Sequence, residues 1–177
     1  HGEEIVGFSV YPPVMHEDVP RCPVCYDSIY KQATKAECNA CFGTTYEGGI
    51  REMSRMWATF STDTLDEHQK KRGIYQPFGF RMQAEHHPML LENDYVMRVK
   101  RWSQAHHPLE IHAAYAVRVV TPESLRTGNQ LGQDGQDYVG QRAMVDELPR
   151  EHVIYQVLDR GIVRDDFPVL RSDGRNR

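Results

Sequence analysis

The 177-residue chain lacks several features that would assign it to a common class. No apolar run approaches the roughly 20 residues that cross a bilayer, and the first residues carry no secretory-signal pattern. No glycine-rich phosphate loop follows a strand pattern, and no G-x-S-x-G element is present. The formal net charge of −4 argues against a protein whose main task is to hold nucleic-acid phosphates. We therefore expect neither a membrane span, a nucleotide-binding fold nor a serine hydrolase.

Cysteine is also scarce, with four residues in two pairs: Cys22 and Cys25, then Cys38 and Cys41. Each pair has CxxC spacing, which brings two thiolates together on a short turn, and two such pairs can close a tetrahedral Cys₄ site. We predict one structural Zn²⁺ ion per chain, held by these four cysteines. Two disulfides or a CxxC redox site are the alternatives, although redox sites normally use a single pair at the start of a helix.

The segment around the cysteines, residues 22–49, has too few large apolar side chains to fold alone. Zinc would supply the missing stabilisation, and a Cys₄ site leaves no coordination position open for chemistry. The length and the apolar fraction of 40% fit one domain of ordinary size with a small appendage. We divide the chain into an extended N-terminal arm, a zinc segment, a β-barrel-like body and a C-terminal tail, over residues 1–21, 22–49, 50–158 and 159–177.

Short strand patterns separated by glycine- and proline-rich turns dominate the rest of the chain. They predict a mainly β fold, an antiparallel β-barrel or sandwich. The clearest alternation runs from Ile111 to Val120. Further strands are expected over Ile50–Phe60, Phe78–Ala84 and Asp94–Trp102, with a hairpin over Tyr138–Leu148 and Val153–Leu158.

Three segments lack a strand pattern. Several prolines predict that residues 1–21 form an extended arm, because proline removes a backbone donor and biases its neighbour away from helix. Residues 62–72 have a weak helical pattern, for which we expect a short helical turn or a loop. The polar, glycine-spaced stretch from Thr121 to Asp137 predicts a long loop that contacts other subunits or faces a channel.

Two histidine doublets, His86-His87 and His106-His107, are the other candidates for a metal site. Adjacent side chains in an extended segment point to opposite sides, so a doublet seldom supplies two ligands. Each doublet also precedes a proline at the end of a strand pattern. Exposed loop histidines are therefore favoured over a second metal site.

Aromatic residues alternate with arginines around Trp57, Tyr95 and Trp102. This pattern is typical of a barrel core and rim, which we favour, or of a surface that stacks single-stranded nucleic acid. No nucleophile lies beside a base in any known signature, so we expect no catalytic residue.

The residues around the cysteines follow a specific order. The chain reads Arg21-Cys22-Pro23-Val24-Cys25-Tyr26-Asp27, then Cys38-Asn39-Ala40-Cys41-Phe42-Gly43-Thr44, then Gly48-Gly49. This order resembles the zinc-bearing N-terminal part of virion neck proteins from long-tailed bacteriophages. Leu91–Val96, and Tyr138–Arg142 with Val153–Val157, resemble strands of the same head-tail connector barrels. The chain departs from the pattern at Thr45, where glycine is usual, and at Ile50, where an aromatic residue is usual.

The resemblance implies a non-enzymatic neck or head-closure protein. Copies of the chain would form a ring that joins the capsid portal to the tail and lines the DNA channel without sequence-specific contact. The implied partners are portal or adaptor proteins and tail proteins, and the implied place is the virion, assembled in the host bacterial cytoplasm. A mildly acidic chain suits this role, because affinity for DNA phosphates comes from lysine and arginine.

Two other functions remain open. A cytosolic zinc-ribbon nucleic-acid-binding protein is the main alternative, and it would bind short DNA or RNA tightly, with steep salt dependence. A metal hydrolase built on the histidine doublets would need a second metal ion in each chain.

Overall fold

The computed structural model describes residues 2–10, 19–35, 37–62, 79–105, 107–128, 134–159 and 169–171. Strands dominate these ranges, and the only helix within them is a short 3-10 helix. The strands are β1 (Glu3–Val10), β2 (Tyr26–Asp27), β3 (Gln32–Ala33), β4 (Ile50–Thr62), β5 (Phe80–Ala84), β6 (Tyr95–Trp102), β7 (Pro108–Gly128), β8 (Asp134–Glu147) and β9 (Val169–Arg171), and the helix is η1 (Val153–Val157). The prediction of a mainly β fold is confirmed.

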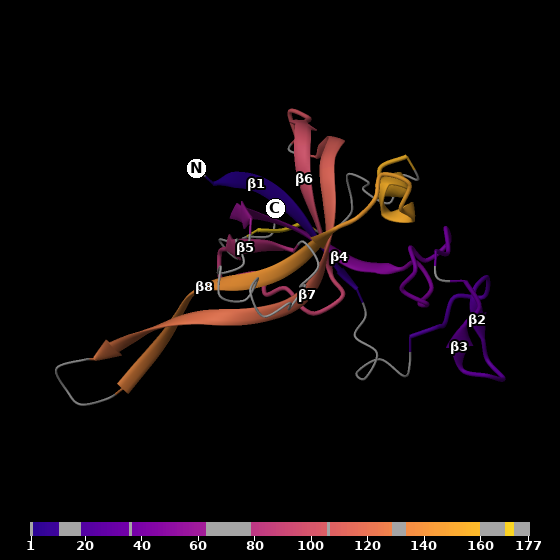
Figure 1. Ribbon diagram of the computed structural model, residues 1–177, viewed down its shortest axis with the longest axis horizontal. Helices are drawn as coiled ribbons and strands as arrows, with labels where there is room; N and C mark the ends of the chain where they lie inside the picture. Colours follow the sequence, from indigo (N-terminus) through magenta and orange to yellow (C-terminus); the bar gives the residue numbers. More distant parts are fainter. Residues whose placement is uncertain are drawn as a thin grey trace, which may run out of the picture.

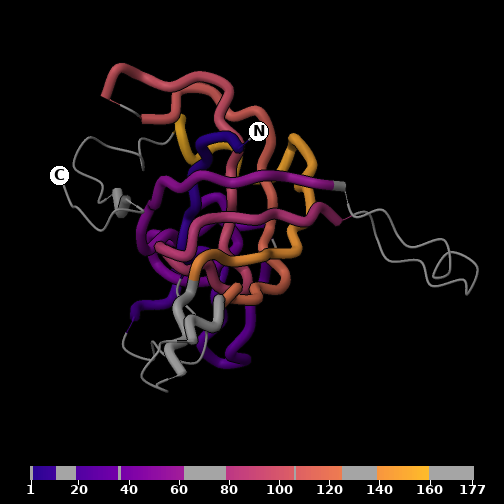
Figure 2. The backbone as a smooth tube through the Cα atoms, turned by 90° about the vertical axis from the view of Figure 1, so that its left-hand side faces the viewer, coloured from indigo at the N-terminus to yellow at the C-terminus, as the bar shows by residue number. Residues whose placement is uncertain are grey.

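Six of the strands close into a ring of paired neighbours (Figure 1). The order is β1-β6-β7-β8-β5-β4, and β4 pairs back with β1, with every pairing antiparallel. Figure 2 shows β4, β5 and β8 running side by side. The short β9 adds to β4 in parallel, at Met53–Arg55. Closure gives each strand of the ring two hydrogen-bonded neighbours, which satisfies most of its backbone groups.

One face of the strands fills the barrel interior with apolar side chains. Ile5, Met56, Met82 and Val96 are buried there, and Tyr115 lies among them. Phe60 stacks on Tyr115 with ring centroids 5.2 Å apart. Burial of these side chains provides the main drive for closing the barrel.

A second apolar cluster, the outer cluster, lies on the opposite face of β1, β4, β6 and β7. Successive side chains of a strand point to opposite faces, so the neighbours of the interior residues form this layer. The helix η1 and one residue of the cysteine segment complete it. Its buried members are Val6, Phe8, Phe42, Ile50, Met53, Met97, Ala114, Val153, Ile154 and Val157. β1 is therefore buried on both faces.

The prediction of an extended arm over residues 1–21 is wrong for Glu3–Val10. This segment is β1, which pairs with both β4 and β6 and is buried from Ile5 to Val10. A strand buried on both faces has no alternation of apolar and polar residues, so its sequence lacks the usual strand signal. Residues 11–18 of the predicted arm lie outside the described residues.

The prediction of a long loop over residues 121–137 is also wrong. β7 continues to Gly128 and β8 begins at Asp134, so the two strands form a hairpin that extends beyond the barrel (Figure 1). β7 loses its β6 partner after Ala116, and β8 has its β5 partner only from Gln141. The polar composition fits a two-stranded ribbon with few apolar neighbours, which we call the hairpin arm: Glu123–Gly128 and Asp134–Gly140.

The prediction that Val153–Leu158 forms the second strand of a C-terminal hairpin is wrong as well. Val153–Val157 forms η1, with the His152 ring nitrogen Nδ1 accepting a hydrogen bond from the Ile154 N–H at 3.2 Å. Val153, Ile154 and Val157 are buried in the outer cluster. A helical turn brings these three side chains to one face, which a short strand cannot do.

The remaining strand predictions are confirmed. Ile50–Phe60, Phe78–Ala84 and Asp94–Trp102 correspond to β4, β5 and β6, with Phe78 outside the described residues. Ile111–Val120 and Tyr138–Leu148 correspond to parts of β7 and β8. The predicted turn or loop at residues 62–72 lies outside the described part of the chain, apart from Thr62 at the end of β4. No helix among the described residues is long and apolar enough to span a membrane.

Candidate metal centre

Two turns of the cysteine clip, residues 21–35 and 37–49, position the four cysteines. In the first turn, the Tyr26 N–H donates to the Cys22 carbonyl at 3.0 Å, which folds the CxxC pair back on itself. In the second, the Thr44 N–H and hydroxyl donate to the Cys41 carbonyl at 3.0 and 2.7 Å. The Cys22 N–H donates to the Thr45 carbonyl at 2.9 Å and ties the two turns together.

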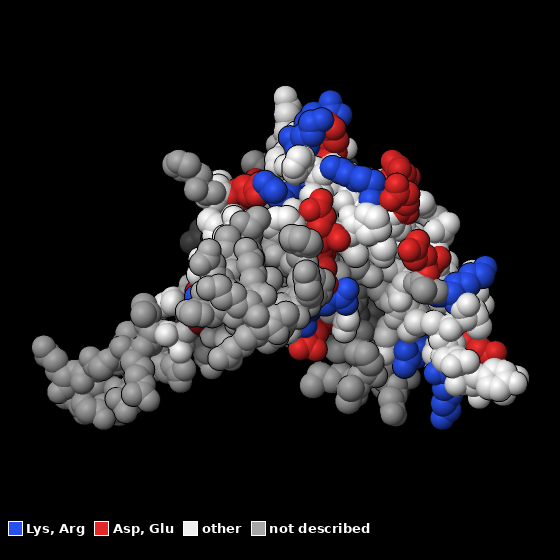
Figure 3. All heavy atoms as spheres, viewed as in Figure 1, with Lys and Arg blue, Asp and Glu red and all other residues white. Residues whose placement is uncertain are grey.

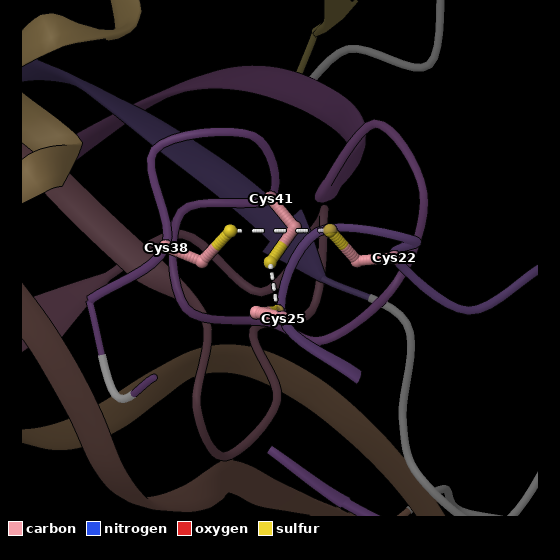
Figure 4. A group of neighbouring side chains, drawn as sticks. All are labelled: Cys22, Cys25, Cys38 and Cys41. Atoms are coloured by element: carbon pink, nitrogen blue, oxygen red, sulfur yellow. Dashed lines mark hydrogen bonds between the residues drawn. The ribbon is translucent and has the colours of Figure 1, made fainter. Parts of the chain in front are cut away.

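The four sulfur atoms point toward one another from these turns (Figure 4). All of them lie within 4.8 Å of one another, and all four cysteines are buried. The Cys22 and Cys38 sulfurs are 3.9 Å apart, and those of Cys25 and Cys41 are 3.4 Å apart. Tetrahedral Zn²⁺ with bonds of about 2.3 Å separates its sulfur ligands by about 3.8 Å. The cluster is therefore compatible with a single tetrahedral metal ion.

Two opposing effects act on the pKa values of the cysteine thiols. Burial raises the pKa of the Cys25 and Cys41 thiols. Burial acts in the same direction on Cys38, but the backbone N–H groups of Ala40 and Cys41 offset it and lower the pKa of Cys38 to about 7. A bound metal ion would relieve this conflict, because coordination deprotonates a thiol and partly offsets the charge of its thiolate. Backbone donors aimed at sulfur then stabilise the thiolate ligand.

The turn after Cys41 depends on left-handed backbone. Phe42, Gly43 and Thr45 have φ of +54°, +80° and +68°, and Gly49 has φ of +73°. A Cβ atom at Gly49 would lie 2.5 Å from the Cys41 carbonyl oxygen, far inside contact distance. Only glycine fits there. Thr45 occupies its left-handed position at the strain cost of a β-branched residue.

The clip is fixed to the barrel by residues that the sequence did not single out for this role. Phe42 is fully buried in the outer cluster, and its carbonyl accepts a hydrogen bond from the Tyr95 hydroxyl at 3.2 Å. Within the clip, Arg21 lies over the rings of Tyr26 and Tyr46, 5.0 and 4.0 Å from their centroids. The sequence could have indicated this role for Phe42, because it is an aromatic residue directly after the last cysteine, in a segment with few other large apolar residues.

The other candidate residues do not join this cluster. Among the described residues, the four cysteines are the only group of three or more potential ligands close enough to hold a metal ion. His86 and His87 lie in a bend between β5 and β6, and His87 is exposed, while His106 lies outside the described residues. Trp57 is exposed, and Tyr95 and Trp102 pack against the outer cluster.

Comparison with known proteins adds no family assignment. A scan against protein-family models found no match, and a search of the curated proteins found none either.

Proposed function

We propose that the four cysteines hold one structural Zn²⁺ ion. The observation that supports this is the buried set of four sulfurs at tetrahedral spacing, in which every coordination position is taken by cysteine. A saturated site has no position for a substrate or an activated water, so its task is to hold the clip in shape. The clip in turn covers part of the outer cluster through Phe42.

Metal analysis of the purified full-length chain tests the zinc proposal. We expect about one zinc per chain and, by X-ray absorption, four sulfur neighbours at about 2.3 Å. The Cys38→Ser variant should lose zinc and loosen the clip. Val24→Ser, which changes an exposed side chain in the same turn, is the matched control and should keep zinc. Zinc-free protein with an intact clip, or a disulfide between two of the cysteines, contradicts the proposal.

We further propose that the chain is a structural protein of a bacteriophage neck, forming a ring between the capsid portal and the tail. The specific order of residues in the cysteine clip supports this role through its resemblance to zinc-bearing neck proteins. A closed barrel with two projections, the cysteine clip and the hairpin arm, is suited to contacts between copies in a ring (Figure 1). The role requires no catalysis.

Localisation and loss of function test this role together. In phage particles that carry this chain, antibody labelling should mark the junction between head and tail. A nonsense mutation in its gene should leave DNA-filled heads and separate tails that do not join, and the wild-type chain supplied in trans should restore infectious particles. Joined, infectious particles made without the chain contradict the proposed role.

A zinc-ribbon nucleic-acid binder is the second candidate, and the charge distribution does not favour it. On the face drawn in Figure 3, the coloured residues of both signs are interspersed and form no continuous basic surface. Exposed cations such as Arg118, Lys100 and Arg142 are paired with carboxylates. Tight binding to short DNA or RNA that weakens steeply with salt would favour this candidate over the neck protein.

A further inference from the structure

The turn between β2 and β3 presents two large apolar side chains to solvent. Ile29 is 83% exposed and Tyr30 is 72% exposed, and Lys31 follows them. We call these three residues the clip tip. Single exposed apolar residues are common, so exposure alone carries little weight. The hydrogen bonds of the backbone beneath the clip tip are stronger evidence for a binding surface.

The clip tip is pre-organised by its own hydrogen bonds. One carboxylate oxygen of Asp27 accepts from the Ile29 N–H at 2.8 Å and from the Tyr30 N–H at 3.1 Å. The Thr34 N–H donates to the Cys25 carbonyl at 2.7 Å, which ties the far end of the turn to a cysteine of the cluster. A turn fixed in this way holds Ile29 and Tyr30 outward before any partner arrives, and pre-organisation lowers the entropy cost of binding.

A second group of exposed apolar residues surrounds the base of the hairpin arm. Met89 and Leu91 lie in the loop between β5 and β6 and are 45% and 39% exposed. Val119 on β7 and Val139 on β8 are 49% and 52% exposed, and they lie on either side of the point where the hairpin arm leaves the barrel. Hydrogen bonds join this loop to the parts of β8 and β7 that lead into the hairpin arm: the Leu90 N–H donates to the Gln141 side chain, and the Asn93 N–H donates to the Val117 carbonyl. We call Met89, Leu91, Val119 and Val139 the arm-base patch.

The two groups are complementary in charge as well as in polarity. Lys31 follows the apolar residues of the clip tip, and the exposed Glu92 directly follows Leu91 of the arm-base patch. The clip and the hairpin arm project on opposite sides of the body (Figure 1). The clip tip and the arm-base patch do not cover each other within one chain, because both are exposed there. A contact between them therefore requires two copies of the chain.

We propose that the clip tip of one copy docks on the arm-base patch of the next copy. Such a contact joins two different surfaces, so each copy keeps one free tip and one free patch for further neighbours, which closes a ring or extends a chain. The partner is a second copy of this protein, recognised by Ile29 and Tyr30 against apolar side chains and by Lys31 against Glu92. This inference deepens the proposed ring and rests on it.

Sedimentation equilibrium of the zinc-loaded full-length chain tests the contact. The wild-type chain should self-associate, and the Ile29→Ser/Tyr30→Ser and Leu91→Ser variants should each weaken association at least tenfold. Leu109→Ser is the matched control, because Leu109 is 50% exposed and belongs to neither surface. Zinc content and thermal stability should stay unchanged in all of them, because every replaced side chain is exposed.

Two further experiments distinguish this contact from a symmetric dimer. Lys31→Glu should weaken association, and Glu92→Lys in the same chain should restore it. A mixture of the tip variant and the patch variant should stop at a one-to-one complex, because only one intact contact can form between them. The inference is overturned if the wild-type chain stays monomeric at high concentration, or if the tip variants associate as strongly as the wild type.

The inference and the proposed function can fail separately. If the chain is labelled at the head-tail junction but the clip-tip variants self-associate as the wild type does, only the docking contact is overturned. Association through the clip tip in a protein that is absent from phage necks would overturn only the neck role.

Discussion

Gly48 and Gly49 both lie in left-handed backbone at the end of the cysteine clip, but only Gly49 has a neighbour that excludes a side chain. A Cβ atom at Gly48 would meet nothing within 4 Å, whereas one at Gly49 would lie 2.5 Å from the Cys41 carbonyl oxygen. We expect Gly48→Ala to lower the free energy of unfolding by about 1 kcal/mol, from backbone strain alone. Gly49→Ala should cost about 3 kcal/mol, because the clash displaces the backbone of a cysteine ligand.

Denaturant unfolding and zinc affinity, measured on both variants, check this prediction. The larger loss of zinc affinity should belong to Gly49→Ala. Equal losses in the two variants would mean that the turn can move away from Cys41 without disturbing the cluster.

Asp94 is a buried carboxylate that joins three parts of the barrel. Its oxygens accept from the Val10 N–H at 2.9 Å and the Leu91 N–H at 2.8 Å, and its carbonyl accepts from the Val117 N–H. Burial raises the pKa of Asp94 from 3.8 to about 6, although the two N–H donors and the nearby Arg51 act to lower it. The folded state therefore binds this proton more tightly than the unfolded state does.

Stability should consequently decrease as the pH rises through the range in which Asp94 ionises. The contribution of Asp94 is fully present below about pH 4 and is lost as the pH passes 6, and the whole loss is about 3 kcal/mol. Of this, roughly 1 kcal/mol falls between pH 5 and pH 7. The denaturant midpoints of the wild type and of Asp94→Asn, measured in the same buffers, isolate the pH dependence that comes from Asp94, because the two proteins have all other titrating groups in common. Parallel pH profiles of the two proteins would contradict the prediction.

At the scale of elements, the Phe42 side chain couples the clip to the barrel. Phe42 enters the outer cluster between the clip and the strands, and it is fully buried. Phe42→Ala should lower the free energy of unfolding by about 3 kcal/mol, through lost burial and the cavity left behind. The four cysteines should still bind zinc, because Phe42 supplies none of the sulfurs.

Hydrogen exchange over residues 21–49 and metal analysis separate these two effects. Faster exchange in the clip at unchanged zinc content is the expected result. Tyr30→Ala, an aromatic truncation at an exposed position of the same clip, should leave the exchange unchanged. Slow exchange in Phe42→Ala would mean that the clip is held to the barrel by other contacts.

At the scale of the whole molecule, closure of the ring depends on β1. This strand lies between β4 and β6 and contributes to both the barrel interior and the outer cluster. Removal of residues 1–10 should leave two unpaired edges and two opened apolar layers, and the protein should lose cooperative unfolding and expose apolar surface.

Thermal unfolding and binding of an apolar dye check this result. Removal of residues 160–177, which takes away only the three-residue β9 pairing among the described contacts, is the control and should leave a cooperative barrel. A folded barrel without residues 1–10 would show that β1 is dispensable for closure.

Features that depend on short-range spacing could be predicted from the sequence. The two CxxC pairs predicted the four-cysteine cluster, because each pair lies within one turn and needs only a second pair nearby. The strands at Asp94–Trp102 and Ile111–Val120 were predicted from side chains that alternate with a period of two, although Ala113 to Val117 are buried on both faces of the sheet.

Tertiary structure decided the features whose residues depend on distant partners. Glu3–Val10 is a strand because β4 and β6 receive it on both edges and apolar layers cover both of its faces, which removes alternation from its sequence. Val153–Val157 is helical because three of its side chains fill one site in the outer cluster. Beyond the ends of β5 and β6 the two strands of the hairpin arm pair only with each other, so the alternation that burial of one face imposes on a strand is absent from their sequence.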